Sequence, residues 1–193
     1  MSGTHDSALH FIVDRLRAHG YRFTTPTPTT HARFVAHRER ARDLRDVLGW
    51  TLPFSGDVIP PEIAEALLVA DAIEERGEMF LSRVRVSTLN EDYYLHSAYP
   101  TTQQDAVFFG PDSYRFADFL RAEFTDIPPR THIVDIGTGA GVGAITAARA
   151  FPEAYVTLTD INPAATRLAA INWVANNFPF GGVMFKRGDG LHV

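Results

Sequence analysis

The sequence predicts an α/β protein in two parts, a mainly helical region over residues 1–105 and the beginning of a parallel sheet over residues 106–193. Apolar residues recur at helical spacing between residues 6 and 72, and an apolar strand at 133–136 runs directly into a glycine-rich turn. Strand-like and helix-like segments then alternate to residue 190, which is typical of a parallel sheet whose strands are joined by helices.

Length, composition and charge are those of a globular protein. The 193 residues are 45% hydrophobic and 21% charged with a net charge of −5, so nucleic-acid binding would need a local basic patch. No apolar run is long enough to cross a membrane, and Asp14, Arg15 and Arg17 interrupt the stretch where a signal peptide would be apolar. The lack of cysteine excludes disulfides and thiolate chemistry. We expect a cytoplasmic protein without membrane association.

The first part is predicted to contain three helices, over residues 6–19, about 30–48 and 60–77, each followed or ended by a glycine. The second of these helices is rich in arginine, which favours a solvated surface with ion pairs over a surface that binds RNA or protein. Its arginines are Arg33, Arg38, Arg40, Arg42 and Arg45.

Alternating residues from Phe80 onward, with a turn near Asn90, predict a β-hairpin that places Arg83 and Arg85 on one exposed face. A segment at residues 107–116 then leads into an amphipathic helix. In this segment Phe109 or Tyr114 is interpreted either as an aromatic lid over a ligand or as simple packing between the two domains.

The second part opens with the most informative motif in the chain. Ile133, Val134 and Ile136 form a strand that carries one acid, Asp135, and four alternating glycines follow it at 137, 139, 141 and 143. Glycine allows backbone angles and close approaches that a Cβ would block, and the helix that follows presents free N–H groups. This arrangement predicts a cradle for a nucleotide-sized ligand.

Two ligand classes use such a turn. The run Gly139 to Ala144 satisfies the alanine form of the dinucleotide fingerprint, so an NAD(P)-binding oxidoreductase stays open. Asp135 favours a ligand with an ammonium group over a pyrophosphate. Here the sequence, from Val134 to Gly141, resembles motif I of the class I S-adenosylmethionine (SAM)-dependent methyltransferases.

Two further strands support this resemblance. Residues 155–160 end in Asp160, about twenty residues beyond the glycines, and residues 183–185 precede Asp189. The resemblance implies a partial Rossmann-like methyltransferase sheet, with Asp135 near the methionine amine, Asp160 on the ribose and Asp189 at the adenine amino group. The expected SAM-binding residues are Asp135, Gly137, Thr138, Gly139, Gly141, Asp160, Ile161, Asn162, Asp189 and Gly190.

Residues 106–193 are similar to the methyltransferase small domain group, which includes protein-glutamine N-methyltransferases acting on release factors and ribosomal RNA base methyltransferases. Pro111 and Asp112 fit the segment that precedes motif I in the glutamine enzymes, whereas Tyr114 and Arg115 depart from it. The resemblance implies N-methylation of a protein glutamine or an rRNA base.

The substrate loop of this group, Asn-Pro-Pro-Tyr after the fourth strand, does not occur in these 193 residues. We therefore expect either a fragment of a longer enzyme, inactive alone, or a second chain that completes the sheet. No catalytic residue can be named, and no cluster of His, Asp or Glu has metal-ligand spacing. A non-catalytic module that binds RNA or protein is the other alternative.

Overall fold

A computed structural model describes residues 2–125 and 127–190. The chain divides into two compact units, residues 1–102 and 103–193, and each unit is described by itself. The sequence placed this boundary three residues later, between 105 and 106. No helix among the described residues is long and apolar enough to span a membrane.

The core of the first unit lies between its first and fourth helices, α1 (Ser2–Ala18) and α4 (Pro61–Val69), which pack against each other. Ile12 and Leu16 of α1 and Ile63 and Leu67 of α4 are completely buried. Their spacing of four residues places each pair on one helix face, so the predicted periodicity is confirmed for α1.

The single helix predicted for residues 30–48 is wrong. The structure has two short helices, α2 (Pro28–Val35) and α3 (Leu44–Leu48), with irregular chain between them. Asp46 is buried and accepts hydrogen bonds from Arg38 Nη1 (2.8 Å) and from the backbone N–H of Arg42 (2.9 Å). Asp43 caps α3 by accepting from two backbone N–H groups. Side-chain bonds to the backbone therefore replace the continuing helix.

The strands of the first unit form two antiparallel hairpins: β1 (Ile73–Arg76) with β2 (Met79–Ser82), and β3 (Val84–Leu89) with β4 (Asp92–Ser97). The β3–β4 turn at Asn90 is confirmed. The third predicted helix is too long, since α4 ends before Ala70 and the next residues form β1.

The exposed position expected for Arg85 is also wrong. Its side chain is 3% exposed, and its Nε donates to the Gly49 carbonyl at 2.6 Å. The guanidinium lies 5.4 Å from the centre of the Phe23 ring, so the charge is held by a carbonyl and an aromatic face. Arg85 is therefore a structural residue of the first unit.

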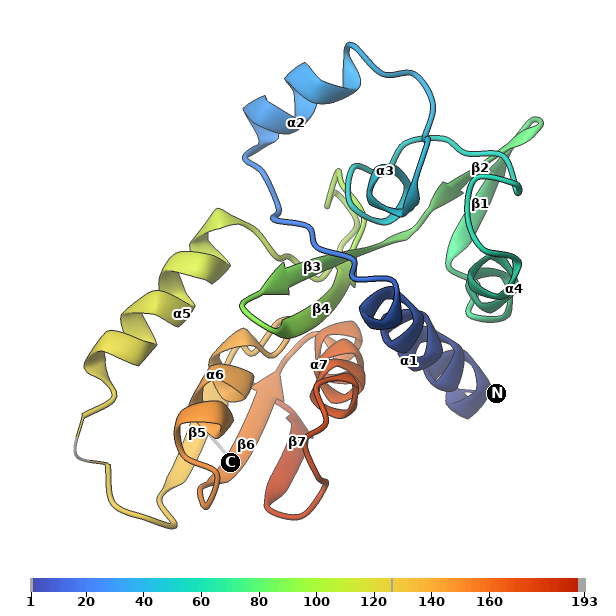
Figure 1. The fold of residues 1–193 in the computed structure, drawn as a ribbon. Helices are drawn as coiled ribbons and strands as arrows, with labels where there is room; N and C mark the ends of the chain where they lie inside the picture. Colours follow the sequence, from blue (N-terminus) through green and yellow to red (C-terminus); the bar gives the residue numbers. More distant parts are fainter. Residues whose placement is uncertain (1, 126, 191–193) are drawn as a thin grey trace. The chain divides into compact units, whose positions relative to one another are not determined.

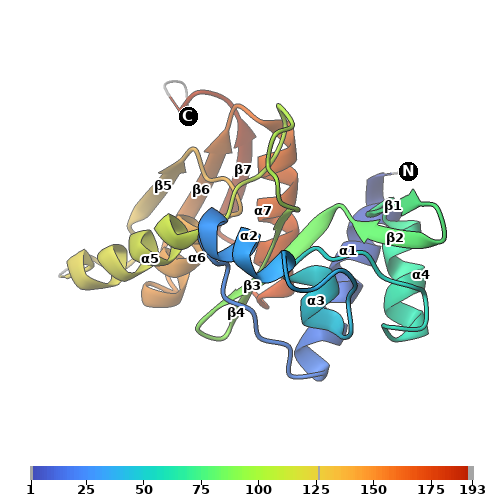
Figure 2. The ribbon, with the colours of Figure 1, turned by 90° about the horizontal axis from the view of Figure 1, so that it is seen from above.

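The second unit contains a parallel three-stranded sheet in the order β5 (His132–Ile136), β6 (Tyr155–Asp160) and β7 (Val183–Arg187). The helices α6 (Val142–Ala150) and α7 (Pro163–Ala175) cover one face, and α5 (Pro111–Glu123) packs on α6 (Figures 1 and 2). The predicted partial Rossmann-like sheet is confirmed.

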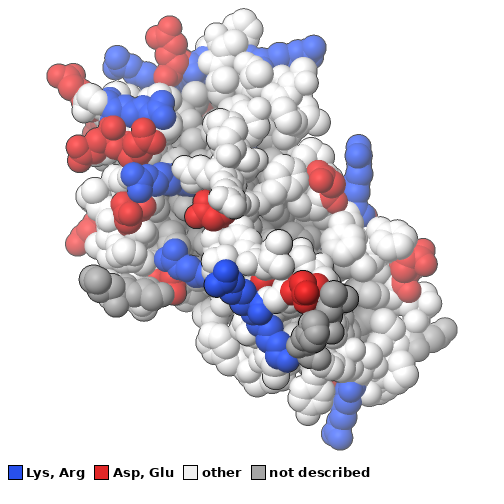
Figure 3. Space-filling model, turned by 180° about the vertical axis from the view of Figure 1, so that it is seen from behind, with Lys and Arg blue, Asp and Glu red and all other residues white. Residues whose placement is uncertain are grey.

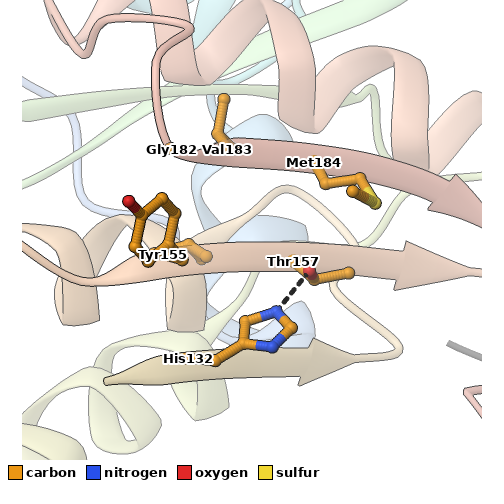
Figure 4. Close-up of a pocket in the computed structure, with 7 residues that line it drawn as sticks. His132, Tyr155, Thr157, Gly182, Val183 and Met184 are labelled. Atoms are coloured by element: carbon orange, nitrogen blue, oxygen red, sulfur yellow. Dashed lines mark hydrogen bonds between the residues drawn. The ribbon is translucent and has the colours of Figure 1, made fainter. Parts of the chain in front are cut away.

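The other face of this sheet is apolar and open in the part of the chain that the structure describes. Val134, Ile136, Tyr155 and Met184 are 41–62% exposed on it. A hollow of about 420 Å³ lies at the amino ends of the strands (Figure 4), where His132 Nε2 and Thr157 Oγ1 are 2.8 Å apart. Ligands of open α/β sheets bind outside the carboxyl ends of strands, so this hollow is better explained as a packing surface.

His96 is completely buried in the first unit. Its Nε2 lies 2.8 Å from Ser87 Oγ, and its Nδ1 lies 3.1 Å from the Ser97 carbonyl oxygen. Burial, assisted by the Arg85 charge, lowers the pKa of His96 to about 3. The folded state therefore keeps this imidazole neutral, while the unfolded chain protonates it below about pH 6.5.

We predict that the free energy of unfolding falls as the pH is lowered from about 6.5 towards 3, because the unfolded state then binds more protons. The His96 contribution has a slope of at most about 1.4 kcal/mol per pH unit. Urea unfolding at pH 7 and pH 5 measures it. His96→Gln should reduce the difference between the two pH values, and His37→Gln, which removes an exposed histidine, should not. An unchanged difference in His96→Gln would contradict the assignment.

Candidate functional site

The glycine loop between β5 and α6 is fastened to the neighbouring strand. The backbone N–H groups of Gly137 and Thr138 both donate to the Thr159 carbonyl, at 2.9 and 3.0 Å. Gly139 and Gly141 have φ angles of +54° and +86°, in the left-handed region that favours glycine. The loop therefore turns sharply at the carboxyl ends of β5 and β6, and this turn leads into α6.

Asp135 lies beneath this loop and connects it to the start of α6. Its Oδ2 accepts hydrogen bonds from Thr138 Oγ1 at 2.6 Å and from the Ala144 backbone N–H at 3.0 Å. A Cβ at Gly143 would lie 2.9 Å from Asp135 Oδ1 and 3.0 Å from Phe116 Cε1. Glycine at 143 therefore allows the carboxylate and the aromatic ring to approach the helix backbone.

The charge of Asp135 is costly in this position. Burial raises the pKa of Asp135, the hydrogen bonds from Thr138 and Ala144 lower it, and the nearby Asp160 charge raises it further. The net effect is a raised pKa, because desolvation of the charged form is the largest contribution. A cationic group bound beside this carboxylate would offset that cost.

Asp160, at the end of β6, holds the loop from the other side. Its Oδ2 accepts from the Gly139 backbone N–H at 3.0 Å, and its Oδ1 accepts from the Asn162 backbone N–H at 2.9 Å. Asn162 in turn caps α7 by accepting from Ala164 N–H at 2.9 Å. The position of this half-buried carboxylate is therefore fixed by the loop and by the start of α7.

A cavity of about 420 Å³ opens above these groups, within the size range of small-molecule sites. The structure brings together six of the ten predicted SAM-binding residues along its wall: Asp135, Gly137, Thr138, Gly139, Asp160 and Asn162. The other four, Gly141, Ile161, Asp189 and Gly190, do not line it. Asp189 is exposed at the end of β7.

Two aromatic residues that the sequence interpretation missed also line the cavity. Phe108 and Phe116 are 52% and 44% exposed beside the carboxylates. Phe109 is buried, and its ring meets Tyr114 edge-to-face at 5.2 Å within the second unit. Phe108 is exposed, and the next residue, Phe109, is buried. The sequence alone does not tell which of these two phenylalanines faces the cavity, and the position of the cavity shows that it is Phe108.

The groups that line the cavity fit a cationic adenosyl ligand better than a dinucleotide. Two carboxylates lie on its wall, and among the described lining residues there is no lysine or arginine to balance a pyrophosphate. The phenylalanine rings provide an apolar surface beside them. No group of His, Asp or Glu that could hold a metal ion occurs among the described residues.

Comparison with known proteins shows what the second unit is similar to. Residues 108–192 match the model of the family described as "Methyltransferase small domain". Two curated relatives carry the name tRNA1(Val) (adenine(37)-N6)-methyltransferase. The relative from Flavobacteriaceae bacterium (strain 3519-10) is 34% identical over 59 residues, which are 31% of this chain and 26% of that protein. The relative from Vibrio parahaemolyticus is 44% identical over 46 residues, which are 24% and 19% of the two chains.

The matched stretches therefore span about a quarter or less of the length of these relatives. Among solved structures, P. horikoshii TYW2 in complex with MeSAdo is similar with a TM-score of 0.45 and 19% identity, over 65% of this chain and 45% of that chain. The predicted motif I, the parallel sheet and the family match agree. The second unit is therefore similar to the methyltransferase small domain family over residues 108–192.

Proposed function

We propose that the protein binds SAM in the cavity at the carboxyl ends of β5 and β6 and takes part in methyl transfer to a nitrogen atom. The observation that carries this proposal is the convergence of Asp135, Asp160 and the glycine loop on one cavity. When bound, SAM supplies an electrophilic methyl group on a sulfonium. The residues of this chain bind and orient it.

Each residue of the cavity has a proposed task. Asp135 holds the ammonium of the methionine part, because burial disfavours its charge and a cation beside it would offset that cost. Asp160 accepts hydrogen bonds from the ribose hydroxyls, and Phe108 and Phe116 exclude water from the apolar side. A contact of Asp189 with the adenine amino group, together with roles for Gly141, Ile161 and Gly190, stays a prediction.

We favour an RNA base as the methyl acceptor. The names of both curated relatives specify a tRNA adenine, and residues 108–192 match a methyltransferase family model. An rRNA base belongs to the same class of acceptor, and a protein glutamine is the second candidate. We also propose a cytoplasmic location.

We also propose that further polypeptide completes the sheet of the second unit. Among the described residues β5 pairs only with β6, so its outer edge is open. The apolar face beside it carries Ile136, Tyr155 and Met184 in exposed positions. An open edge next to an apolar face favours pairing with another segment or a second chain.

Asp160→Ala should weaken SAM binding by about 1.5–3 kcal/mol, the range for a hydrogen bond to a charged group, or about 10- to 150-fold in Kd. Isothermal titration with SAM measures it, with NAD as a second ligand that should not bind. Asp118→Ala, which removes an exposed acid of α5 paired with Arg121, is the matched control. Equal SAM affinity in Asp160→Ala and wild type would remove Asp160 from the site.

The Asp135→Asn substitution separates the effect of the Asp135 charge on stability from its effect on SAM binding. Both hydrogen bonds end on one oxygen, Oδ2, so an asparagine oxygen can accept both while the charge is lost. We expect unchanged or higher thermal stability at pH 7, because the raised pKa means that the charged form is penalised there.

The same variant should bind SAM at least about tenfold more weakly. In the wild type, SAM affinity should fall as the pH is lowered through the raised pKa of Asp135, since protonation removes the charge that the ammonium meets. In Asp135→Asn the affinity should vary little over the same pH range. Wild-type affinity in the variant would place the ammonium elsewhere.

The open sheet face predicts self-association of this chain. Tyr155→Lys combined with Met184→Lys should lower it, because lysine opposes packing on an exposed sheet surface. Sedimentation velocity over a range of concentrations measures the effect. Leu68→Lys with Val69→Lys, two exposed apolar residues of α4 in the first unit, provides the control. A wild-type chain that stays monomeric at all concentrations would contradict self-association through this face.

A further inference from the structure

The first unit carries a hollow of about 480 Å³ that the methyltransferase site does not use. Its apolar floor and its charged rim come from three segments, the end of α1, the start of α3 and the chain before α4. The floor is made by Tyr21, Leu44, Val58 and Pro60. The rim is made by His19, Arg22, Arg42, Asp43 and Arg45.

The backbone around this hollow is firmly held. Tyr21 is buried, and its hydroxyl donates to the Val86 carbonyl at 2.9 Å. Asp43 accepts from the N–H groups of Arg45 and Asp46 at 2.9 Å, which fixes the first turn of α3. The Arg42 N–H donates to Asp46, which Arg38 also contacts. The arginines therefore project from fixed positions.

The arginines of the rim differ in the contacts that they make within the protein. Arg22 donates to the Asn90 carbonyl at 2.6 Å and pairs with Glu91. Arg45 is 63% exposed and lies 3.7 Å from Asp43. The Arg42 side chain is exposed, and no side-chain partner is found for it within residues 2–125 and 127–190. Arg42 and Arg45 are the cations best placed to meet a ligand.

Charge is segregated along the first unit. Residues 19–45 contain six arginines against Glu39 and Asp43, whereas residues 57–78 contain seven acids and Arg76. On the face drawn in Figure 3 acidic and basic side chains are interspersed, so no broad basic surface is present there. The hollow, with Arg22, Arg42 and Arg45 against Asp43 on its rim, is a local basic site.

The chemistry of the hollow matches a nucleotide. Guanidinium groups bind phosphate through paired hydrogen bonds, and an apolar floor beside them accepts the flat face of a base. Asp43 can accept a hydrogen bond from a base amino group or a ribose hydroxyl. We propose that this hollow binds a nucleotide of single-stranded RNA, with Arg42 and Arg45 on its phosphates and the base against Leu44, Val58 and Pro60.

As a site for the methyl-accepting RNA, this inference rests on the proposed function, but RNA binding itself is measured without SAM. The probe is a fluorescein-labelled, unstructured 12-nucleotide RNA, bound to the full chain and followed by anisotropy at several salt concentrations. Arg42→Gln with Arg45→Gln should weaken binding at least tenfold. The slope of log affinity against log salt should fall by about 1.4, at about 0.7 for each lost phosphate contact on a single strand.

The matched control is Arg76→Gln with Arg83→Gln, which removes the same charge from two exposed arginines of the first unit. It should leave affinity and salt slope unchanged. Thermal unfolding checks that both double variants are folded, and Arg42→Gln alone should lower the slope by about 0.7.

Equal weakening in both double variants, or no wild-type binding to the RNA, would overturn the inference. Displacement of the RNA by inorganic phosphate at a similar phosphate concentration would identify a small-anion site instead. Displacement by poly-glutamate at a similar charge concentration would identify a surface for an acidic protein. None of these results would alter the Asp160→Ala titration with SAM, so the two proposals fail separately.

Discussion

The carboxylate of Asp135 joins the three parts on which the second unit's site depends: the end of β5, the glycine loop and the start of α6. One oxygen accepts from Thr138 and from Ala144, so the loop and the helix are held to the same atom. Burial makes the charge expensive, and the close approach requires glycine at 143. The spacing of the glycines, the direction of α6 and the position of Asp135 therefore depend on one another.

Asp160 repeats this arrangement one strand further along. It accepts from Gly139 in the loop and from Asn162 at the start of α7, and Asn162 caps that helix. Each acid thus lies near the carboxyl end of a strand, holds the glycine loop and accepts from a backbone N–H at the start of a helix. Because parallel strands all present their carboxyl ends at one edge, two such acids must lie near each other. A ligand that carries a cation and hydroxyl groups can bind to these two carboxylates, whose positions are already fixed by their hydrogen bonds to the backbone.

The sequence predicted the second unit well because its signals are local. Asp135 and Asp160 lie near the ends of strands, and Asn162 and Pro163 mark the start of a helix. The spacing between the two acids is typical of parallel strands joined by a helix. The first unit was predicted less well because long-range contacts decide it. Buried Asp46 binds Arg38 and the Arg42 backbone in the irregular chain where the arginine-rich pattern predicted a continuous helix. Arg85 is buried and donates to the Gly49 carbonyl. The periodicity of apolar and charged residues in the sequence indicates neither of these contacts.

The two hollows of the second unit are similar in volume but opposite in chemistry, and this contrast decides between them. The hollow drawn in Figure 4 lies where strands begin, and apart from the contact between His132 and Thr157 its wall is mostly apolar. The cavity at the strand ends has two carboxylates and a loop of backbone groups. Apolar surface gains most from burial against more polypeptide, whereas a desolvated carboxylate gains most from a cation. One face of this sheet is therefore suited to assembly and its carboxyl edge to a ligand.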